Sequence, residues 1–279
     1  MHFASKIINQ LNMKQTILVT GASSGIGLLI GNKLHECGFH VIGTSRNPEN
    51  YQDNVPFKLM QLDISDNESI ESFVLQLFGQ IGHLDVLINN AGYLLRGLAE
   101  ETEIEMGKQQ FETNFWGTVT LTKELLPYFR KQRHGKVITT SSFLGLIGHP
   151  NVAYYSASKH ALEGYFKSLR FELNQFNIKV SMVEPTYFKT SIGQNSIASS
   201  GRIGDYDEFR QNVAAYGGNS LKNAPAPAPV IDAILKIIGE KEPKFNYPVG
   251  KGTSLLLALQ RFAYNGFEKA ILKRVKAAK

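Results

Sequence analysis

The sequence of 279 residues predicts a doubly wound α/β fold, in which a parallel sheet of about seven strands carries helices on both faces. Two observations predict this class. From Gln15 onward, short apolar runs alternate with longer amphipathic segments at the spacing of successive β-α-β units. A glycine-rich turn, "TGASSGIG" (20–27), also follows the first apolar run and opens directly into a helical segment. Repeats and signs of a second domain are not seen, so 1–279 is interpreted as one domain.

The strands are expected in chain order at 16–20, 40–44, 57–62, 85–89, 136–140, 179–183 and 244–248. The helices between them are expected at roughly 26–36, 103–129, 152–175 and 230–239, with another beginning at Ser65. Ser65 is followed three residues later by Glu68, and this spacing is that of a capping box. We expect 14–190 to form a cofactor-binding and catalytic core.

Two segments depart from the alternation. Residues 186–223 are rich in serine, glycine and asparagine and contain scattered aromatic residues, and loops of this length in compact domains are usually functional or disordered. We interpret this segment as a mobile substrate-binding loop, joined to the helix near Val230 by the stiff stretch "NAPAPAPVI". Residues 253–279 are expected to be a C-terminal helical extension.

Composition limits the classes of protein to consider. The chain is 43% hydrophobic and 19% charged, which is sufficient for a large core. The single cysteine, Cys37, excludes an internal disulfide framework and leaves no cysteine cluster for zinc, so no metal site is expected. The first residues lack the apolar stretch of a secretory signal, and a cytoplasmic location is therefore expected. The net charge of +6 is spread along the chain, which favours attraction to a phosphorylated cofactor over nucleic-acid binding.

The glycine-rich turn predicts a phosphate cradle. Glycines at 21, 25 and 27 let the backbone turn sharply, and the helix that follows offers free N–H groups to phosphate. The spacing is neither G-x-G-x-x-G nor a P-loop, so a nucleoside triphosphate is disfavoured. The alternative is a turn that only closes a β-α unit.

The end of the second strand favours NADP(H) over NAD(H). Folds that prefer NAD carry a carboxylate there for the ribose 2′-hydroxyl, whereas this chain has Ser45 followed by Arg46. A guanidinium binds a 2′-phosphate in a forked geometry. The alternative is a surface arginine paired with the nearby Glu49.

Tyr155 and Lys159 are four residues apart in a predicted helix, so their side chains share one face. An ammonium group close to a phenol stabilises the phenolate, and the pair is therefore suited to proton transfer. A surface helix produces the same spacing by chance, and only the rest of the chain decides between the two.

The motifs together resemble those of the short-chain dehydrogenase/reductase family. They occur in the family's order as "TGASSGIG", Asp63, "NNAG" (89–92), "TNFWG" (113–117), "TTSS" (139–142) and "YSASK" (155–159). The resemblance covers 15 to about 190 and implies a Rossmann-type fold. It also implies an oxidoreductase that moves a hydride between NADP(H) and a carbonyl or secondary alcohol.

The resemblance implies roles for individual residues. Tyr155 would transfer the proton, Ser142 would hydrogen-bond the reacting oxygen, Lys159 would lower the pKa of the tyrosine and hold the nicotinamide ribose, and Asn114 would hold a water. The implied cofactor contacts are Gly21, Ser23, Ser24, Gly25, Ile26, Gly27, Ser45, Arg46, Asp63, Ile64, Asn89, Ala91, Gly92, Tyr155, Lys159, Pro185 and Thr190. The family's glycine after the sixth strand is replaced by Thr186, which puts the holding of the nicotinamide amide in doubt.

The substrate is expected to be a lipophilic carbonyl or alcohol, because the predicted substrate contacts are Phe143, Tyr93 and Tyr187 and apolar linings bind apolar ligands. The wording of the catalytic helix resembles the branch that contains 17β-hydroxysteroid and retinol dehydrogenases. The family usually forms dimers or tetramers, and the same is expected here. A catalytically silent protein that binds or senses NADP(H), and a scaffold that serves only assembly, are the alternatives.

The segment from Thr253 combines apolar residues at helical spacing with a cluster of lysines and arginines near the chain end. Docking on the body of the protein is favoured for this basic amphipathic helix. Contact with an anionic membrane, a cap over the substrate cleft and contact with a second subunit are alternatives.

Overall fold

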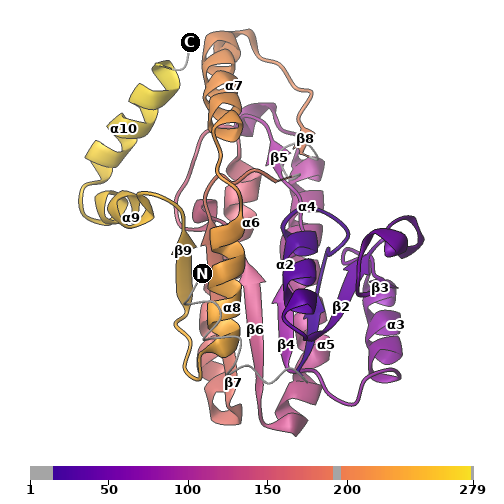
Figure 1. The fold of residues 1–279 in the computed structure, drawn as a ribbon. Helices are drawn as coiled ribbons and strands as arrows, with labels where there is room; N and C mark the ends of the chain where they lie inside the picture. The colour runs from indigo at the N-terminus through magenta and orange to yellow at the C-terminus, as the bar shows by residue number, and fades with distance from the viewer. Residues whose placement is uncertain (1–14, 191–195, 278–279) are drawn as a thin grey trace.

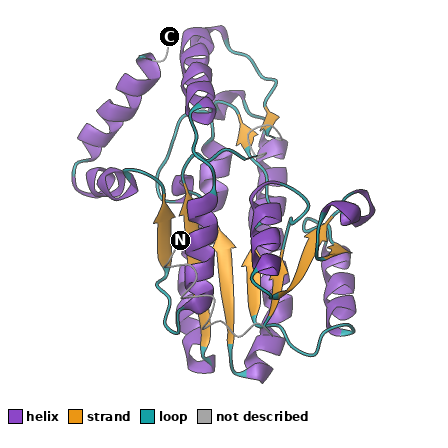
Figure 2. Ribbon diagram, viewed as in Figure 1, coloured by secondary structure: helices purple, strands orange, loops and turns teal. Residues whose placement is uncertain are grey.

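The computed structural model describes residues 15–190 and 196–277, and the parts of the predicted segments that fall on 1–14, 191–195 and 278–279 lie outside the described residues. Seven parallel strands form one sheet in the order β3-β2-β1-β4-β6-β7-β9, with helices on both sides of it (Figures 1 and 2). The predicted fold class is therefore confirmed.

All seven predicted strands are present, with ends that differ by a few residues. They are β1 (Thr16–Val19), β2 (His40–Ser45), β3 (Lys58–Gln61), β4 (Val86–Asn89), β6 (Gly135–Thr140), β7 (Ile178–Pro185) and β9 (Asn246–Val249). Two further strands, β5 (Leu95–Arg96) and β8 (Ile197–Ala198), pair with each other outside the main sheet. These two were not predicted, because two residues are too short to show a period.

Helices cover the two faces in separate groups. The helices are α2 (Gly25–Glu36), α3 (Asn67–Phe78), α4 (Ile104–Phe111), α5 (Gly117–Gln132), α6 (Ala153–Leu173), α7 (Asp207–Lys222), α8 (Ala228–Gly239), α9 (Thr253–Phe262) and α10 (Tyr264–Lys276). The helices α2 and α8 pack on one face, and α3, α5 and α6 pack on the other.

The strands alternate their side chains between the two cores. In β1, Ile17 and Val19 join the core under α2 and α8, whereas Leu18 joins the core under α3, α5 and α6. All three side chains are buried, because both faces are covered. The sheet is thus held by two apolar layers rather than one.

The start of α3 differs from the prediction. The N-cap is Asp66, whose carboxylate accepts a hydrogen bond from the backbone N–H of Glu68, and the helix begins at Asn67. Ser65 instead donates its hydroxyl proton to Asp63 at 2.6 Å. An ionised carboxylate is a stronger acceptor than a hydroxyl, and Asp66 therefore takes the capping position.

The predicted helix at 103–129 is divided by a π-helical turn, Glu112–Trp116, which separates α4 from α5. Residues 186–223 were expected to be a loop, yet they contain the 16-residue helix α7. The C-terminal segment forms two helices, α9 and α10, which meet at Ala263. Serine, glycine and asparagine lower helix propensity in α7, and tertiary contacts outweigh that deficit.

We predict that Phe166→Ala, which removes a fully buried ring of α6, lowers the free energy of unfolding by about 3–5 kcal/mol. The control is Phe171→Ala on the same helix, whose side chain is 77% exposed and should leave stability almost unchanged. Urea unfolding followed by circular dichroism measures both. Equal losses in the two variants would contradict the assignment of α6's buried face.

Candidate active site

The site lies where the strand order reverses. The chain proceeds outward from β1 through β2 to β3, and then returns to place β4 on the other side of β1. In open parallel sheets, ligands bind in the crevice beyond the carboxyl ends of strands at such a point. Here the two strand ends are joined, since Thr20 Oγ1 accepts hydrogen bonds from the N–H groups of Asn90 and Ala91 at 2.9 and 3.0 Å.

The glycine-rich turn forms one wall of this crevice. Gly21 and Gly25 have φ angles of 65° and 57°, which favour glycine. Ser24 caps α2 without a side-chain hydrogen bond, and the first turn of the helix holds no acidic residue. The first N–H groups of α2 thus have no competing anion, and the turn is suited to hold a phosphate.

A positively charged side chain after β2 lies near an acidic side chain after β3. Arg46 and Asp63 both line the cavity. Burial would raise the pKa of Asp63, but hydrogen bonds from Ser65 and the charge of Arg46 outweigh it and lower that pKa. Asp63 is therefore ionised at neutral pH, and the two groups flank the expected adenosine end of the site.

A cavity of about 1080 Å³ brings most of the predicted residues together. Of the predicted site residues, those that line it are Gly21, Ser23, Ser24, Gly25, Ile26, Ser45, Arg46, Asp63, Ile64, Ala91, Gly92, Tyr93, Ser142, Phe143, Tyr155, Lys159, Pro185, Tyr187 and Thr190. Thr186 also lines it and packs against Gly250, where an added Cβ would lie 2.0 Å from Thr186 Oγ1. The threonine in place of the family's glycine is thus matched by a glycine opposite.

Three predicted residues do not line the cavity. Asn89 is buried and donates to Thr122 Oγ1 and Thr139 Oγ1, and its neighbour Asn90 lies in the cavity instead. A strand directs successive side chains to opposite sides, so a shift of one residue reverses the assignment. A Cβ on Gly27 would lie 2.2 Å from the carbonyl oxygen of Gly21, which indicates that this glycine permits close packing of α2.

Asn114 is the third predicted residue that does not line the cavity, and it is fully buried in the π-helical turn. Its side-chain amide pairs with the backbone of Tyr93: Oδ1 accepts from Tyr93 N–H and Nδ2 donates to Tyr93 C=O, each at 3.0 Å. Asn114 thereby fixes the segment after β4 that forms part of the cavity wall. Its predicted role in holding a water stays a prediction.

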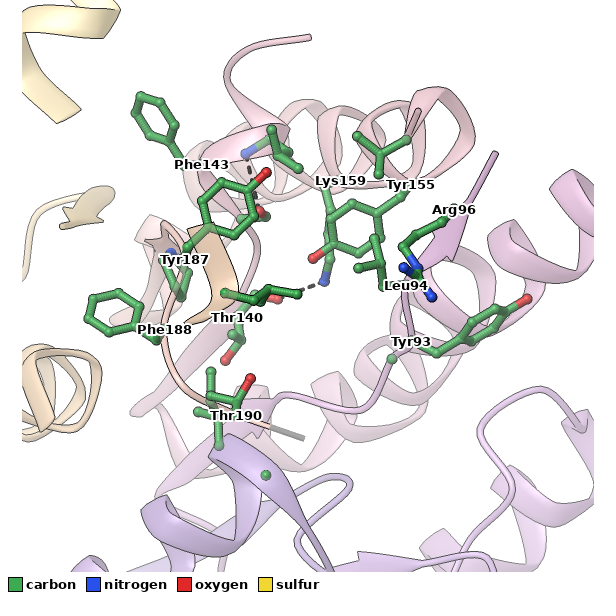
Figure 3. Close-up of a pocket in the computed structure, with 18 of the residues that line it drawn as sticks. Tyr93, Leu94, Arg96, Thr140, Phe143, Tyr155, Lys159, Tyr187, Phe188 and Thr190 are labelled. Carbon is green, nitrogen blue, oxygen red and sulfur yellow. Dashed lines mark hydrogen bonds between the residues drawn. The ribbon is translucent and has the colours of Figure 1, made fainter. Parts of the chain in front are cut away.

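Ser142, Tyr155 and Lys159 lie together at the wall formed by the end of β6 and by α6. Figure 3 shows Tyr155 and Lys159 projecting from the same helix. Lys159 Nζ donates a hydrogen bond to the carbonyl oxygen of Thr140 at 2.9 Å. The Lys159 Nζ lies 5.8 Å from the centre of the Tyr155 ring. The neighbouring Tyr154 instead packs on α4, where a Cβ on Gly107 would lie 2.3 Å from its ring.

Burial dominates the electrostatics of this wall. It raises the pKa of Tyr155 to about 12, although a hydrogen bond with Ser142 opposes the shift. Burial also lowers the pKa of Lys159 to about 8, and the charge of Glu163 opposes that shift. Burial is therefore the largest influence on the pKa of the phenol, and the predicted lowering of that pKa by Lys159 stays a prediction. At neutral pH the wall carries a neutral phenol and an ammonium group.

Beyond Tyr155 most of the lining side chains are aromatic or aliphatic, with Arg96 among them. Phe143, Tyr187 and Phe188 lie on one side of the Tyr155 ring, and Leu94 and Arg96 lie on the other (Figure 3). The ring of Tyr216, from α7, stacks on His149 with 5.4 Å between their centres. Burial lowers the pKa of His149, which is therefore neutral at pH 7.

The C-terminal helices contribute to this chamber, which the sequence indicated as an alternative to docking on the body alone. Leu256 of α9 and Ile271 of α10 line the cavity, and Ile271 packs in an apolar cluster with Phe143 and Ile147. The signal that pointed to it was the helical spacing of Phe267, Ile271 and Val275, all three of which are buried. The extension therefore docks on the body and also closes one end of the chamber.

An ion pair joins the 197–222 segment to the core. Arg210 of α7 donates from Nε to Glu101 Oε2 at 3.0 Å and from Nη2 to Glu101 Oε1, and Glu101 Oε1 also accepts from Ile203 N–H at 2.8 Å. The Glu101 side chain is only 2% exposed. We call this arrangement the Glu101–Arg210 clasp, and it ties α7, which lines the cavity, to the core.

Within the described ranges, 15–190 and 196–277, groups of three or more metal-ligating side chains that could hold a metal ion are absent. In the same part of the chain, no helix is both long and apolar enough to cross a bilayer.

Comparisons with known proteins agree with the geometry. The family described as short chain dehydrogenase matches residues 15–200. The oxidoreductase YusZ of Bacillus subtilis is 36% identical over 94% of this chain and 99% of its own length. A 3-ketodihydrosphingosine reductase of Bacteroides thetaiotaomicron is 40% identical over 88% of this chain and 91% of its own length.

Solved structures show the same fold. A short-chain dehydrogenase from Streptomyces avermitilis superposes with a TM-score of 0.82 at 29% identity, over 95% of this chain and 99% of that one. One from Burkholderia cenocepacia, solved in complex with NADP, superposes with a TM-score of 0.73 at 21% identity, over 93% and 98%.

We predict that Glu101→Gln loosens the Glu101–Arg210 clasp, because a neutral amide cannot accept two charge-assisted hydrogen bonds from the guanidinium. Amide hydrogens of 197–222 should then exchange faster, as measured by mass spectrometry. The control is Glu105→Gln, which breaks the exposed pair with Lys108. Unchanged exchange in Glu101→Gln would show that the clasp does not order this segment.

Proposed function

The chain belongs to the short-chain dehydrogenase family and is an oxidoreductase of that family, which uses nicotinamide cofactors. From this premise we propose that it uses NADPH to reduce the carbonyl group of a lipophilic small molecule. One observation carries the proposal. Ser142, Tyr155 and Lys159 line a single cavity that extends from the glycine-rich turn to an apolar chamber.

The residues present fit the cofactor. Lys159 is buried at the cavity wall, and Nζ donates to one backbone oxygen, so two of its three donors remain for ribose hydroxyls. The N–H groups at the start of α2 suit the pyrophosphate, and Arg46 suits a 2′-phosphate. NADPH, when bound, supplies the hydride.

Tyr155 supplies the proton in this proposal. Because burial raises its pKa to about 12, the phenol is protonated at neutral pH and acts as an acid toward a carbonyl oxygen that gains negative charge. Ser142 lies beside the phenol and donates a hydrogen bond to the same oxygen. The wall is therefore better prepared for reduction than for oxidation, which would begin by ionising the buried phenol.

The substrate class follows from the chamber beyond Tyr155. Phe143, Ile147, Leu256 and Ile271 present apolar surface there. A lipophilic ketone or aldehyde places its carbonyl at Tyr155 and its apolar body against these residues. The name of the Bacteroides relative, a reductase of a 3-keto compound, supports the same direction of reaction.

Titration of the purified protein with NADPH and NADH, followed by nicotinamide fluorescence, tests the first half of the proposal. Consumption of NADPH with a panel of lipophilic ketones and aldehydes tests the second. Tight binding of NADPH without turnover of any carbonyl would favour the silent NADP(H)-binding alternative. Binding of neither nucleotide would contradict the proposal.

We predict that Tyr155→Phe retains NADPH binding and lowers kcat by at least about 100-fold, because a positioned acid contributes roughly 10²–10⁴-fold. The control is Tyr154→Phe, which alters the ring packed on α4 and should leave kcat near that of the parent protein. Steady-state kinetics and fluorescence titration measure the two effects. Full activity in Tyr155→Phe would exclude the proposed acid.

We also predict that Arg46→Ala weakens NADPH binding by about 10- to 100-fold, since hydrogen bonds to charged groups are worth about 1.5–3 kcal/mol. NADH lacks the 2′-phosphate, so its dissociation constant should change little. Arg130→Ala, at an exposed position of α5, is the control. Equal losses for both nucleotides would show that Arg46 does not recognise the 2′-phosphate.

A further inference from the structure

Two carboxyl groups lie buried behind the catalytic lysine. Glu163 is on α6, one helical turn after Lys159, and is 6% exposed; Glu184 is near the end of β7 and is 0% exposed. A single amide bridges them, because Asn246 Nδ2 donates to Glu163 Oε2 at 3.2 Å and to Glu184 Oε1 at 2.5 Å. Neither carboxyl lines the cavity, and the proposed reaction does not use them directly.

The remaining oxygens of the pair are unpartnered. Glu163 Oε1 and Glu184 Oε2 are buried without a hydrogen-bond partner among the described residues. Two full negative charges in this position would be poorly compensated, and like charges that share a buried site favour the binding of one proton. A proton on one carboxyl removes one of the two buried charges.

The surrounding groups indicate which carboxyl carries the proton. Glu163 faces Lys159 and Lys167 from its own helix, and the Ser141 hydroxyl, just after β6, lies beside it. Glu184 faces Glu163, the Asn246 amide and the backbone of Tyr247 on β9. Burial and the charge of Glu163 raise the pKa of Glu184 to about 8. Positive charge lies on the side of Glu163, so Glu163 is the ionised member.

We propose that Glu163 and Glu184 hold one proton between them, and that the negative charge left on Glu163 keeps Lys159 protonated during the reaction. Burial lowers the pKa of Lys159 to about 8, and the charge of Glu163 opposes that shift across one turn of α6. Glu163 acts through Lys159 and is a positioning residue. Glu184, as a neutral acid, prevents a second charge from accumulating. The shared proton does not depend on the proposed function, and only its effect on turnover rests on that function.

Glutamate carboxyl resonances test the shared proton without a substrate. The full-length protein is labelled with ¹³Cδ-glutamate and titrated from pH 5 to 10, and the signals absent from Glu184→Gln and Glu163→Gln are assigned to those residues. The Glu184 signal should titrate with a midpoint near pH 8. A Glu184 carboxyl that is already ionised at pH 6 would overturn the proposal.

The pH dependence of protein stability gives an independent measure of the Glu184 pKa. The folded-state pKa of Glu184 is raised above that of the unfolded chain, so the folded protein retains a proton that the unfolded chain has lost. Stability should therefore decline as pH rises from about 5 to 8, and Glu184→Gln should lose that part of the decline. The control is Glu172→Gln, at an exposed position of α6. Identical slopes in Glu184→Gln and the parent protein would contradict the raised pKa.

Kinetics test the role of the charge once the screen has identified a carbonyl substrate. Glu184→Gln mimics the protonated acid and should retain kcat at pH 7, whereas Glu163→Gln should lower kcat and move the alkaline limb of its pH profile to lower pH. Glu163→Asp should restore part of that shift. A loss in Glu184→Gln equal to that in Glu163→Gln would show that both carboxylates are ionised. If the parent protein turns over no carbonyl, the proposed function fails, while the resonance titration still decides the shared proton.

Discussion

The reversal of strand order between β1 and β4 is the constraint on which the rest of this structure depends. Thr20 at the end of β1 accepts hydrogen bonds from Asn90 and Ala91 after β4, and the Asn90 side chain returns a hydrogen bond to the carbonyl oxygen of Thr20 at 3.0 Å. These contacts hold open a crevice at the carboxyl edge of the sheet. The glycine-rich turn, the end of β2 and the end of β6 all face this crevice, because parallel strands end at the same edge. The cavity that contains the candidate active site is a direct result of this topology.

Burial at the β6–α6 wall has opposite effects on its two ionisable groups. It stabilises the neutral forms, so the pKa of Tyr155 rises and that of Lys159 falls. A tyrosine in this state is protonated at neutral pH, as the proposed proton transfer requires, and a nearby negative charge helps a lysine with a lowered pKa to remain protonated. In the proposed arrangement the buried Glu163, one helical turn after Lys159, supplies that charge, and the buried Glu184 stays neutral. The phenol, the ammonium group and the two buried carboxyls thus lie together, and α6 contributes three of the four residues.

The substrate end is assembled from segments that are distant in the sequence. The Glu101–Arg210 clasp ties α7 to the region after β5, and Ile271 of α10 packs on Phe143 after β6. Neither contact belongs to the sheet. In Figure 1, α9 and α10 extend beyond the edge strand β9, at the same end of the molecule as α7. The cofactor end is therefore built on strand ends and one helix terminus, whereas the substrate end is closed by helices that are held through a few side-chain contacts.

The sequence by itself determined the fold class and the seven strands, because these depend on local periods and on short motifs, and it indicated which residues to propose for the site. The apolar runs indicated the strands, and Tyr155 and Lys159 were proposed from a helical spacing together with the family resemblance of the other motifs. Tertiary structure alone decided that Asn90 rather than Asn89 faces the cavity, that Asp66 rather than Ser65 caps α3, and that residues 207–222 are helical. It also decided the pKa of Tyr155, since desolvation depends on what surrounds a group from every element. The pairing of Glu163 with Glu184 is a contact between a helix and a strand, and it becomes visible only after the chain has folded.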